Sequence, residues 1–406
     1  MPRLIDQNPF VVGLLARGNH FADRENEVEQ IAAALAGPGT RLIVYGDRRL
    51  GKSSTLDRAA TLVRKQGTPV AIASLATASD PVQAAQRVLT ALQKELGRSW
   101  RDLMDQIAQS LNVSFEVDPS ALQMGGLPTM KLSFGMQKPA AARRLLPDVL
   151  SAINEQMTKR GETIGIGLDE FQRIHEWGGE DAEWALRDAL QQHDGIGYVL
   201  AGSKRSLIEA MVTDKGRAFW KITDTLLFGP IDQGVMARWI SSEAGRTGVE
   251  IPAAAAERIV ALTHPRTRDV VQLARAVWFD ARARDGHLDE SGVDQVFDGL
   301  ISEQSELYRV LWTKLDARAQ SVLRAFAADP DVQITAAETS RRFRLGPKSS
   351  VHSAVERLVE AEHLTRLDNG QYGFDDPYFR RWVQVFGLPD IGERTPALSE
   401  WLKPAT

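Results

Sequence analysis

The sequence predicts a multidomain α/β plus α protein: a parallel sheet comes first, an all-helical segment follows, and a winged helix-turn-helix ends the chain. Three observations support this prediction. Val- and Ile-rich runs alternate with helix-like segments as far as Phe228, which favours a parallel sheet with helices on both faces. Helix-like segments then follow one another from Gly234 to about Ile301. The last part contains three amphipathic segments and a hairpin pattern.

Length and composition bound the class of protein. A chain of 406 residues, 43% hydrophobic and 25% charged, predicts two or three folded domains. The net charge of −4 gives no general attraction to nucleic acid, so any DNA contact needs a local basic face. The absence of cysteine excludes disulfides, thiol catalysis and Cys-based zinc sites. No signal-peptide pattern and no apolar run of about twenty residues occur, so we expect a cytoplasmic protein that does not contact a membrane.

A glycine-rich loop lies between the apolar run Leu42–Tyr45 and the helix-like segment Ser53–Arg64. It matches the phosphate-loop pattern G-x-x-x-x-G-K-[ST], in which backbone N–H groups and a helix N-terminus face a phosphate. We expect Lys52 to reach the terminal phosphates and Ser53 to bind Mg²⁺. The alternative, a glycine-rich turn with a surface lysine, is disfavoured by the strand and the helix on either side. The predicted nucleotide-binding residues of the loop are Gly46, Asp47, Arg48, Arg49, Leu50, Gly51, Lys52, Ser53 and Ser54.

A second motif follows the apolar run that begins at Thr163, where the chain reads Asp169-Glu170. Alone, such a pair usually marks a solvated strand end. Downstream of a phosphate loop it indicates nucleotide hydrolysis, with Asp169 in the magnesium shell and Glu170 polarising the attacking water. Ser203 ends the next strand-like run. It is either a hydrogen-bond partner of the γ-phosphate or its water, or a plain turn serine.

Two short runs, Val113–Val117 and Met130–Phe134, alternate apolar and polar residues. They predict a β-hairpin inserted at about 112–136. Two roles remain open for it: covering a sheet edge and contacting a partner.

Five motifs in this order resemble the archaeal-type ATPase family, in the AAA+/STAND branch of P-loop NTPases. They are Asn8-Pro9-Phe10, F-x-x-R-E-x-E at 21–27, the phosphate loop with its double arginine, L-D-E-F-Q at 168–172, and Ala201-Gly202-Ser203. The resemblance extends from about Asn8 to about Trp382. It implies an ASCE-type ATPase core over 1–232, a helical lid over 233–303, a winged helix domain over 304–390 and a tail over 391–406. It also implies ATP and Mg²⁺ as cofactors.

The resemblance implies further nucleotide contacts outside the loop. Asn8, Pro9 and Phe10 stand where the family places an N-terminal nucleotide-binding segment. In the lid, Pro265 would lie near the base, and either Arg266 or Arg268 would sense the nucleotide. A helix-start proline with a solvated arginine would look the same in the sequence.

Arg217 stands where the family often has a Gly-Arg pair before the last strand of the core. Two readings are open. The residue could act as an arginine finger on a neighbouring subunit's nucleotide, or it could form a structural ion pair. Arg205 is a weaker competitor for the finger role.

The C-terminal segment reads as three helices, 315–328, 336–343 and 349–361, followed by two strand-like runs around an Asn-Gly turn at 369–370. This pattern predicts a winged helix-turn-helix. Basic and small polar residues gather before and on the third helix, which suits phosphate anchoring and entry into a DNA groove. The module as a whole is close to neutral, so an intramolecular or protein-binding role also remains open. The candidate DNA contacts are Arg341, Arg342, Arg344, Lys348, Ser349, Ser350, His352, Ser353 and Arg357.

Together these features predict a Mg-ATP-dependent molecular switch. The first hypothesis is an ATPase that binds ATP and ADP and acts on or near double-stranded DNA. The second is a signalling or assembly switch with slow hydrolysis, in which the winged helix contacts protein and a homo-oligomer or partner forms. A degenerate nucleotide-binding scaffold is disfavoured because Lys52, Ser53, Asp169 and Glu170 are all present.

Overall fold

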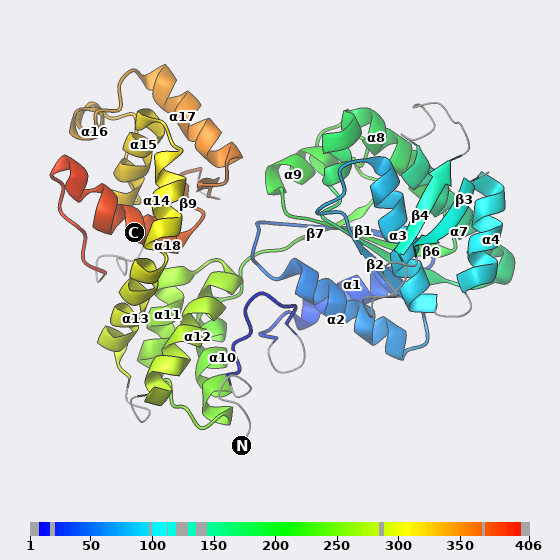
Figure 1. Cartoon of the computed structure of the whole chain (residues 1–406), viewed down its shortest axis with the longest axis horizontal. Helices are drawn as coiled ribbons and strands as arrows, with labels where there is room; N and C mark the ends of the chain where they lie inside the picture. Colours follow the sequence, from blue (N-terminus) through cyan, green and yellow to red (C-terminus); the bar gives the residue numbers. More distant parts are fainter. Residues whose placement is uncertain are drawn as a thin grey trace. The chain divides into compact units, whose positions relative to one another are not determined.

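The computed structural model describes residues 8–16, 21–96, 100–111, 113–118, 129–134, 144–283, 288–367 and 370–398 (Figure 1). The chain divides into two compact units. The N-terminal unit comprises Gly13–Ile231, and the C-terminal unit comprises Asp232–Thr406 together with Met1–Val12. The N-terminal segment is therefore grouped with the end of the chain.

A parallel sheet forms the centre of the N-terminal unit. Among the described residues its strands lie in the order β2-β5-β6-β1-β7. Strand β6 therefore separates β1, which leads into the phosphate loop, from β5, which ends at Asp169. Asp169 at the end of β5 pairs in register with Ala201, and Tyr45 at the end of β1 pairs with Gly202. The carboxyl ends of these strands therefore meet at one edge of the sheet. The strands are β1 (Arg41–Tyr45), β2 (Val70–Ser74), β5 (Ile164–Asp169), β6 (Ile196–Gly202) and β7 (Asp224–Leu227).

Helices cover both faces of this sheet, as the apolar strands predict. Residues such as Ile31 and Leu56 form one buried cluster with α1 and α2, while Val88, Leu150 and Leu186 form another with α3, α7 and α8. Strand β6 is buried along its whole length, which explains its continuous apolar sequence. The helices are α1 (Glu25–Ala36), α2 (Lys52–Lys65), α3 (Pro81–Leu96), α4 (Trp100–Leu111), α7 (Leu145–Arg160), α8 (Arg173–Gln191) and α9 (Arg205–Thr213).

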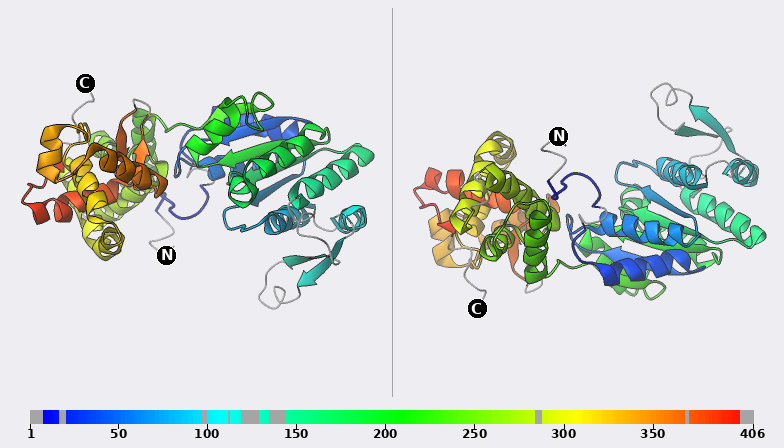
Figure 2. Two further views of the ribbon diagram at one scale, coloured as in Figure 1. Left: turned by 90° about the horizontal axis from the view of Figure 1, so that it is seen from above. Right: turned by 90° about the horizontal axis from the view of Figure 1, so that it is seen from below.

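The inserted hairpin consists of β3 (Val113–Asp118) and β4 (Thr129–Phe134), which pair antiparallel. It forms a sheet of its own and lies against α3 and α4 (Figure 2). The predicted strands are therefore present, and they do not extend the five-stranded sheet.

The C-terminal unit is mainly helical. The helices expected between Gly234 and about Ile301, which we call the lid helices, are present as α10 (Gln233–Arg246), α11 (Ala253–Thr263), α12 (Thr267–Ala283) and α13 (Glu290–Glu303). The winged helix contains α14 (Ser305–Thr313), α15 (Ala317–Ala328), α16 (Ala337–Phe343), α17 (Lys348–Glu360), β8 (Leu364–Arg366) and β9 (Tyr372–Phe374). The predicted turn at Asp368-Asn369 lies outside the described residues, but its two strands pair antiparallel. The unit closes with α18 (Pro377–Trp382), a π-helical turn η4 (Val383–Gly387) and a 3₁₀ turn η5 (Pro389–Ile391).

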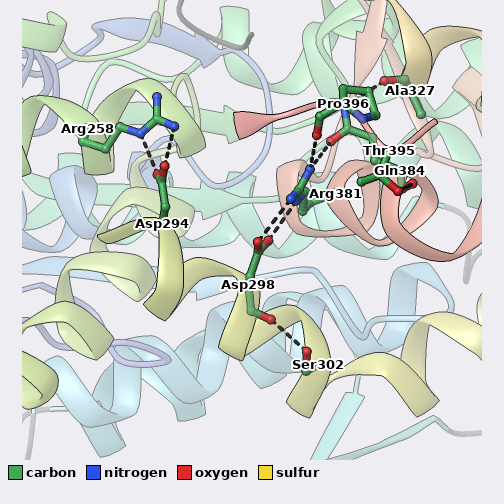
Figure 3. A network of polar contacts seen from close by, with 9 residues as sticks. All are labelled: Arg258, Asp294, Asp298, Ser302, Ala327, Arg381, Gln384, Thr395 and Pro396. Atoms are coloured by element: carbon green, nitrogen blue, oxygen red, sulfur yellow. Dashed lines mark hydrogen bonds and ion pairs between the residues drawn. The ribbon is translucent and has the colours of Figure 1, made fainter. Parts of the chain in front are cut away.

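Helix α18 joins the lid helices to the winged helix. Its Phe379 stacks on Tyr308 of α14 with ring centroids 5.5 Å apart, and Tyr378 packs on Phe297 of α13 at 5.2 Å. Arg381 forms a bidentate pair with Asp298 of α13 at 2.8 and 3.1 Å (Figure 3). The lid helices and the winged helix therefore share one packed interior.

The described N-terminal residues also pack in the C-terminal unit. Phe10 is fully buried, and its ring forms a T-shaped pair with Trp239, with the ring centroids 5.5 Å apart. Asn8 donates from Nδ2 to the carbonyl of Arg275 at 3.3 Å, and its Oδ1 accepts from the N–H of Phe10. The Asn-Pro-Phe motif is thus packed against α10 and α12.

Candidate functional site

The phosphate loop connects β1 to α2. Helix α2 begins at Lys52, directly after Gly51, whose φ of 103° lies in the left-handed region that glycine adopts readily. A Cβ atom at Gly46 would lie 2.2 Å from the carbonyl oxygen of Phe228, so only glycine fits against that backbone. The loop therefore has the backbone approach and the helix N-terminus that a phosphate site needs.

Lys52 is buried, with 6% of its surface exposed. Its Nζ donates to the carbonyls of Gly46 at 2.9 Å and Asp47 at 2.6 Å. The ammonium group therefore lies against the backbone of its own loop. This is the position from which a lysine can contact phosphate oxygens.

Ser53 and Asp169 meet across the loop and β5. The Oγ of Ser53 donates to Oδ2 of Asp169 at 2.7 Å, and the N–H of Glu170 donates to Oδ1 at 3.1 Å. Burial raises the pKa of the Asp169 carboxyl, while the hydrogen bond from Ser53 opposes that shift. A cation bound here would stabilise the charged carboxylate.

The donor set fits Mg²⁺ held jointly by protein and phosphate. Hydroxyl and carboxylate oxygens are its usual protein ligands. No cluster of three or more His, Cys, Asp or Glu side chains that could hold a metal occurs in the described part of the chain. The remaining ligands would then be phosphate oxygens and water, as is common for Mg²⁺.

Glu170 lies at the same edge of the sheet. Its Oε2 accepts from Oγ of Ser203 at 2.7 Å and from Nε2 of Gln172. The Nε of Arg48 in the loop lies 3.4 Å from Oγ of Ser203. The structure thus brings together side chains from the phosphate loop, the end of β5 and the end of β6. The sequence singled out Gln172 only as part of the L-D-E-F-Q motif and gave it no role.

Arg217 is engaged in an ion pair. Its Nη2 and Nε lie 2.6 and 3.2 Å from the carboxylate oxygens of Glu183, which is fully buried. Glu183 also contacts Nδ1 of His175 at 2.6 Å. Arg217 therefore forms a structural ion pair in this structure, which is one of the two interpretations that the sequence left open. The sequence offered no signal for Glu183, which lies in the middle of α8.

The predicted nucleotide contacts in the lid helices differ in burial. Arg266 is buried and pairs with Asp375 before α18, with 2.5 Å between Nη2 and Oδ1. Arg268 and Pro265 are exposed, and a cis peptide bond precedes Pro265. These residues and Asn8-Pro9-Phe10 all belong to the C-terminal unit, whereas the phosphate loop belongs to the N-terminal unit.

The candidate DNA contacts lie on the outer side of α16 and α17. Helix α17 turns Val351, Ala354, Val355 and Leu358 inward, and the predicted polar residues on it are exposed or half-buried. Some of the cations have acidic partners: Arg342 pairs with Glu393 at 2.6 Å and Arg357 with Asp316 at 3.0 Å. Arg341, Arg344 and Lys348 are exposed and form no ion pair with another described residue.

Comparison with known proteins identifies the fold. A family model described as a probable winged helix domain matches residues 306–385. No curated protein sequence matches the chain. Among solved structures, the Walker-type ATPase PABY2304 of Pyrococcus abyssi is similar, with 16% identity, a TM-score of 0.59, and coverage of 93% of this chain and 99% of that one. The Aeropyrum pernix ORC2 protein, solved in ADPNP–ADP complexes, has 16% identity, a TM-score of 0.55, and coverage of 95% and 97%.

These similarities confirm the predicted fold class. The chain has the fold of a P-loop ATPase of the Walker and ORC type, with a winged helix at its C-terminal end. At 16% identity the likeness concerns the fold alone. In the described residues no helix is long and apolar enough to span a membrane.

Proposed function

We propose that this protein is a molecular switch that binds and hydrolyses Mg-ATP, and that its nucleotide state repositions the C-terminal winged helix on or near DNA. The observation that best supports the proposal is the hydrogen bond of 2.7 Å between Ser53 and Asp169, beside the buried Lys52. A loop serine and a strand-end carboxylate are the pair by which such ATPases hold magnesium. Their contact here joins the two motifs that the sequence predicted separately.

The roles of the residues follow from their positions. Backbone N–H groups of the loop and Lys52 would bind the phosphates, and Ser53 and Asp169 would hold the metal. When bound, Mg²⁺ neutralises phosphate charge and orients the γ-phosphate for attack. Glu170 accepts a proton from the attacking water, whose oxygen forms a bond to the γ-phosphorus. The bond to the bridging oxygen breaks, and ADP leaves with the electron pair.

Two variants test the ATPase proposal. Lys52→Ala should abolish ATP binding because it removes the buried cation of the phosphate loop. Glu170→Gln should retain binding and lose turnover, by roughly 10²- to 10⁴-fold for the loss of a general base. Binding is measured with a fluorescent ATP analogue and turnover by phosphate release. Unchanged turnover in Glu170→Gln would show that another residue is the base.

The DNA proposal rests on the exposed cations of α16 and α17. Gel-shift binding to duplex DNA should weaken steeply with salt, because each phosphate contact releases a counterion. The absence of binding at low salt, with and without ATP, would refute it.

A second candidate function is an assembly switch in which the winged helix contacts protein. The pairing of Arg342 with Glu393 and of Arg357 with Asp316 favours it, because these cations already have acidic partners. Mass measurement with and without ATP distinguishes the two functions, since an assembly switch should change its oligomeric state with nucleotide.

A further inference from the structure

Gln172 is a buried amide beside the proposed general base. Only 1% of its surface is exposed, and it lies where β5 gives way to α8. The segment is fixed to β6, because the N–H of Phe171 donates to the carbonyl of Ala201 at 3.0 Å. From this position Nε2 of Gln172 donates to Oε2 of Glu170.

The hydrogen bonds to Glu170 are asymmetric. Ser203 and Gln172 both donate to Oε2, and no described residue donates to Oε1. A carboxylate that is held at one oxygen cannot rotate freely, and its second oxygen remains available as a proton acceptor. The backbone of Glu170 has φ of 57°, a left-handed conformation that is uncommon for residues other than glycine and that clusters at functional sites.

The fold makes room for this amide. A Cβ atom at Gly202, the last residue of β6, would lie 2.3 Å from Oε1 of Gln172. That oxygen is buried and accepts no hydrogen bond from the described residues. An unsatisfied buried polar atom is unfavourable for folding, so its presence needs a reason other than stability. Orientation of Glu170 supplies that reason.

We propose that Gln172 is a positioning residue for ATP hydrolysis. With Ser203 it holds Oε2 of Glu170, so that Oε1 is directed to the attacking water. This inference depends on the proposed function, because it assigns Gln172 a role only through Glu170.

The test is Gln172→Met, which keeps the length of the side chain and removes the donor. We expect kcat to fall by at least about tenfold, but by less than the roughly 10²- to 10⁴-fold loss from removing a general base. The Kd for ATP should stay within about twofold, because Gln172 contacts the base and not the phosphate loop. Gln192→Met, at the exposed end of α8, is the matched control and should behave as wild type. Unchanged kcat in Gln172→Met, or increased kcat, would overturn the inference.

A second measurement separates positioning from a structural role. In the Glu170→Gln background, Gln172→Met should cause no further loss of single-turnover rate, because its effect passes through Glu170. A further loss in that background contradicts positioning. If Gln172→Met does not fold, Gln172→Leu, which also lacks the donor, replaces it.

Failure of the inference is distinguishable from failure of the proposed function. If the wild-type chain neither binds nor hydrolyses ATP, the proposed function is wrong. If turnover is lost in Glu170→Gln but survives in Gln172→Met, only the positioning role is wrong.

Discussion

Arg217→Met should destabilise the N-terminal unit. The substitution keeps most of the apolar stem and removes the guanidinium from Glu183, whose side chain is fully buried. Breaking a buried ion pair by removing one partner typically costs about 3–5 kcal/mol, because an uncompensated charge remains inside. Arg217 is 15% exposed and His175 also contacts the carboxylate, so we expect a loss near the lower end, about 3 kcal/mol.

Urea denaturation of the full chain, followed by tryptophan fluorescence, measures this loss. With a slope of about 3 kcal/mol per molar urea, the midpoint should fall by about 1 M. The double variant Arg217→Met with Glu183→Leu should recover part of the loss, since a well-packed apolar pair often replaces a buried ion pair without cost. Arg309→Met on α14, an exposed arginine 3.7 Å from its acidic neighbour, is the control and should change stability by under about 1 kcal/mol.

The same variant tests the arginine-finger reading. A finger acting in trans predicts that Arg217→Met subunits mixed with Glu170→Gln subunits regain ATPase activity, because each subunit supplies what the other lacks. Unchanged stability together with such complementation would refute the structural reasoning. Lost stability without complementation would support it.

Three further predictions concern other buried or paired groups. Burial lowers the pKa of His193 to about 4, so the unfolded chain binds more protons than the folded chain between pH 6.5 and 4. The free energy of unfolding should therefore fall by roughly 2–3 kcal/mol as the pH decreases across that window. His193→Gln should make this decline shallower. Glu393→Gln releases Arg342, so DNA affinity should rise and the salt slope, measured by fluorescence anisotropy, should steepen by about 1. Arg381→Met removes a buried guanidinium that pairs with the partly exposed Asp298 and donates to the carbonyl of Pro396, and it should cost the C-terminal unit about 2–3 kcal/mol in urea unfolding.

Matched controls exist for each of these. His352→Gln changes an exposed histidine and should leave the pH dependence of stability as in wild type. Glu257→Gln makes the same charge change as Glu393→Gln at an exposed site on α11; an equal gain in DNA affinity would show that net charge is responsible. Arg309→Met is again the control, now for Arg381→Met. Equal losses of unfolding free energy in the two variants would show that burial of the Arg381 guanidinium is unimportant.

The local motifs of the site were predictable because each consists of residues that are consecutive or closely spaced in the sequence. Lys52 and Ser53 follow from the loop pattern, and Asp169 from an apolar strand that ends in acids. A parallel sheet then brings the strand ends to one edge, so the meeting of Ser53 with Asp169 follows from the predicted topology.

Partners that are distant in the sequence were not predictable. Arg217 and Glu183 are 34 positions apart, and Arg266 and Asp375 are 109 apart. Nothing in either local sequence marks the acid as a partner, because the pairing depends on how helices pack. Helix α14 was not predicted as a separate element, because its apolar residues Tyr308 and Trp312 serve the interface with α18.

The chain passes between its two units twice, at Val12–Gly13 and at Ile231–Asp232. The first crossing is anchored by Phe10, which is buried against Trp239 in the C-terminal unit. A protease cut at the second crossing alone should therefore leave the segment around Phe10 bound to the C-terminal fragment, which size-exclusion chromatography of the cut protein would detect as co-elution of the two fragments.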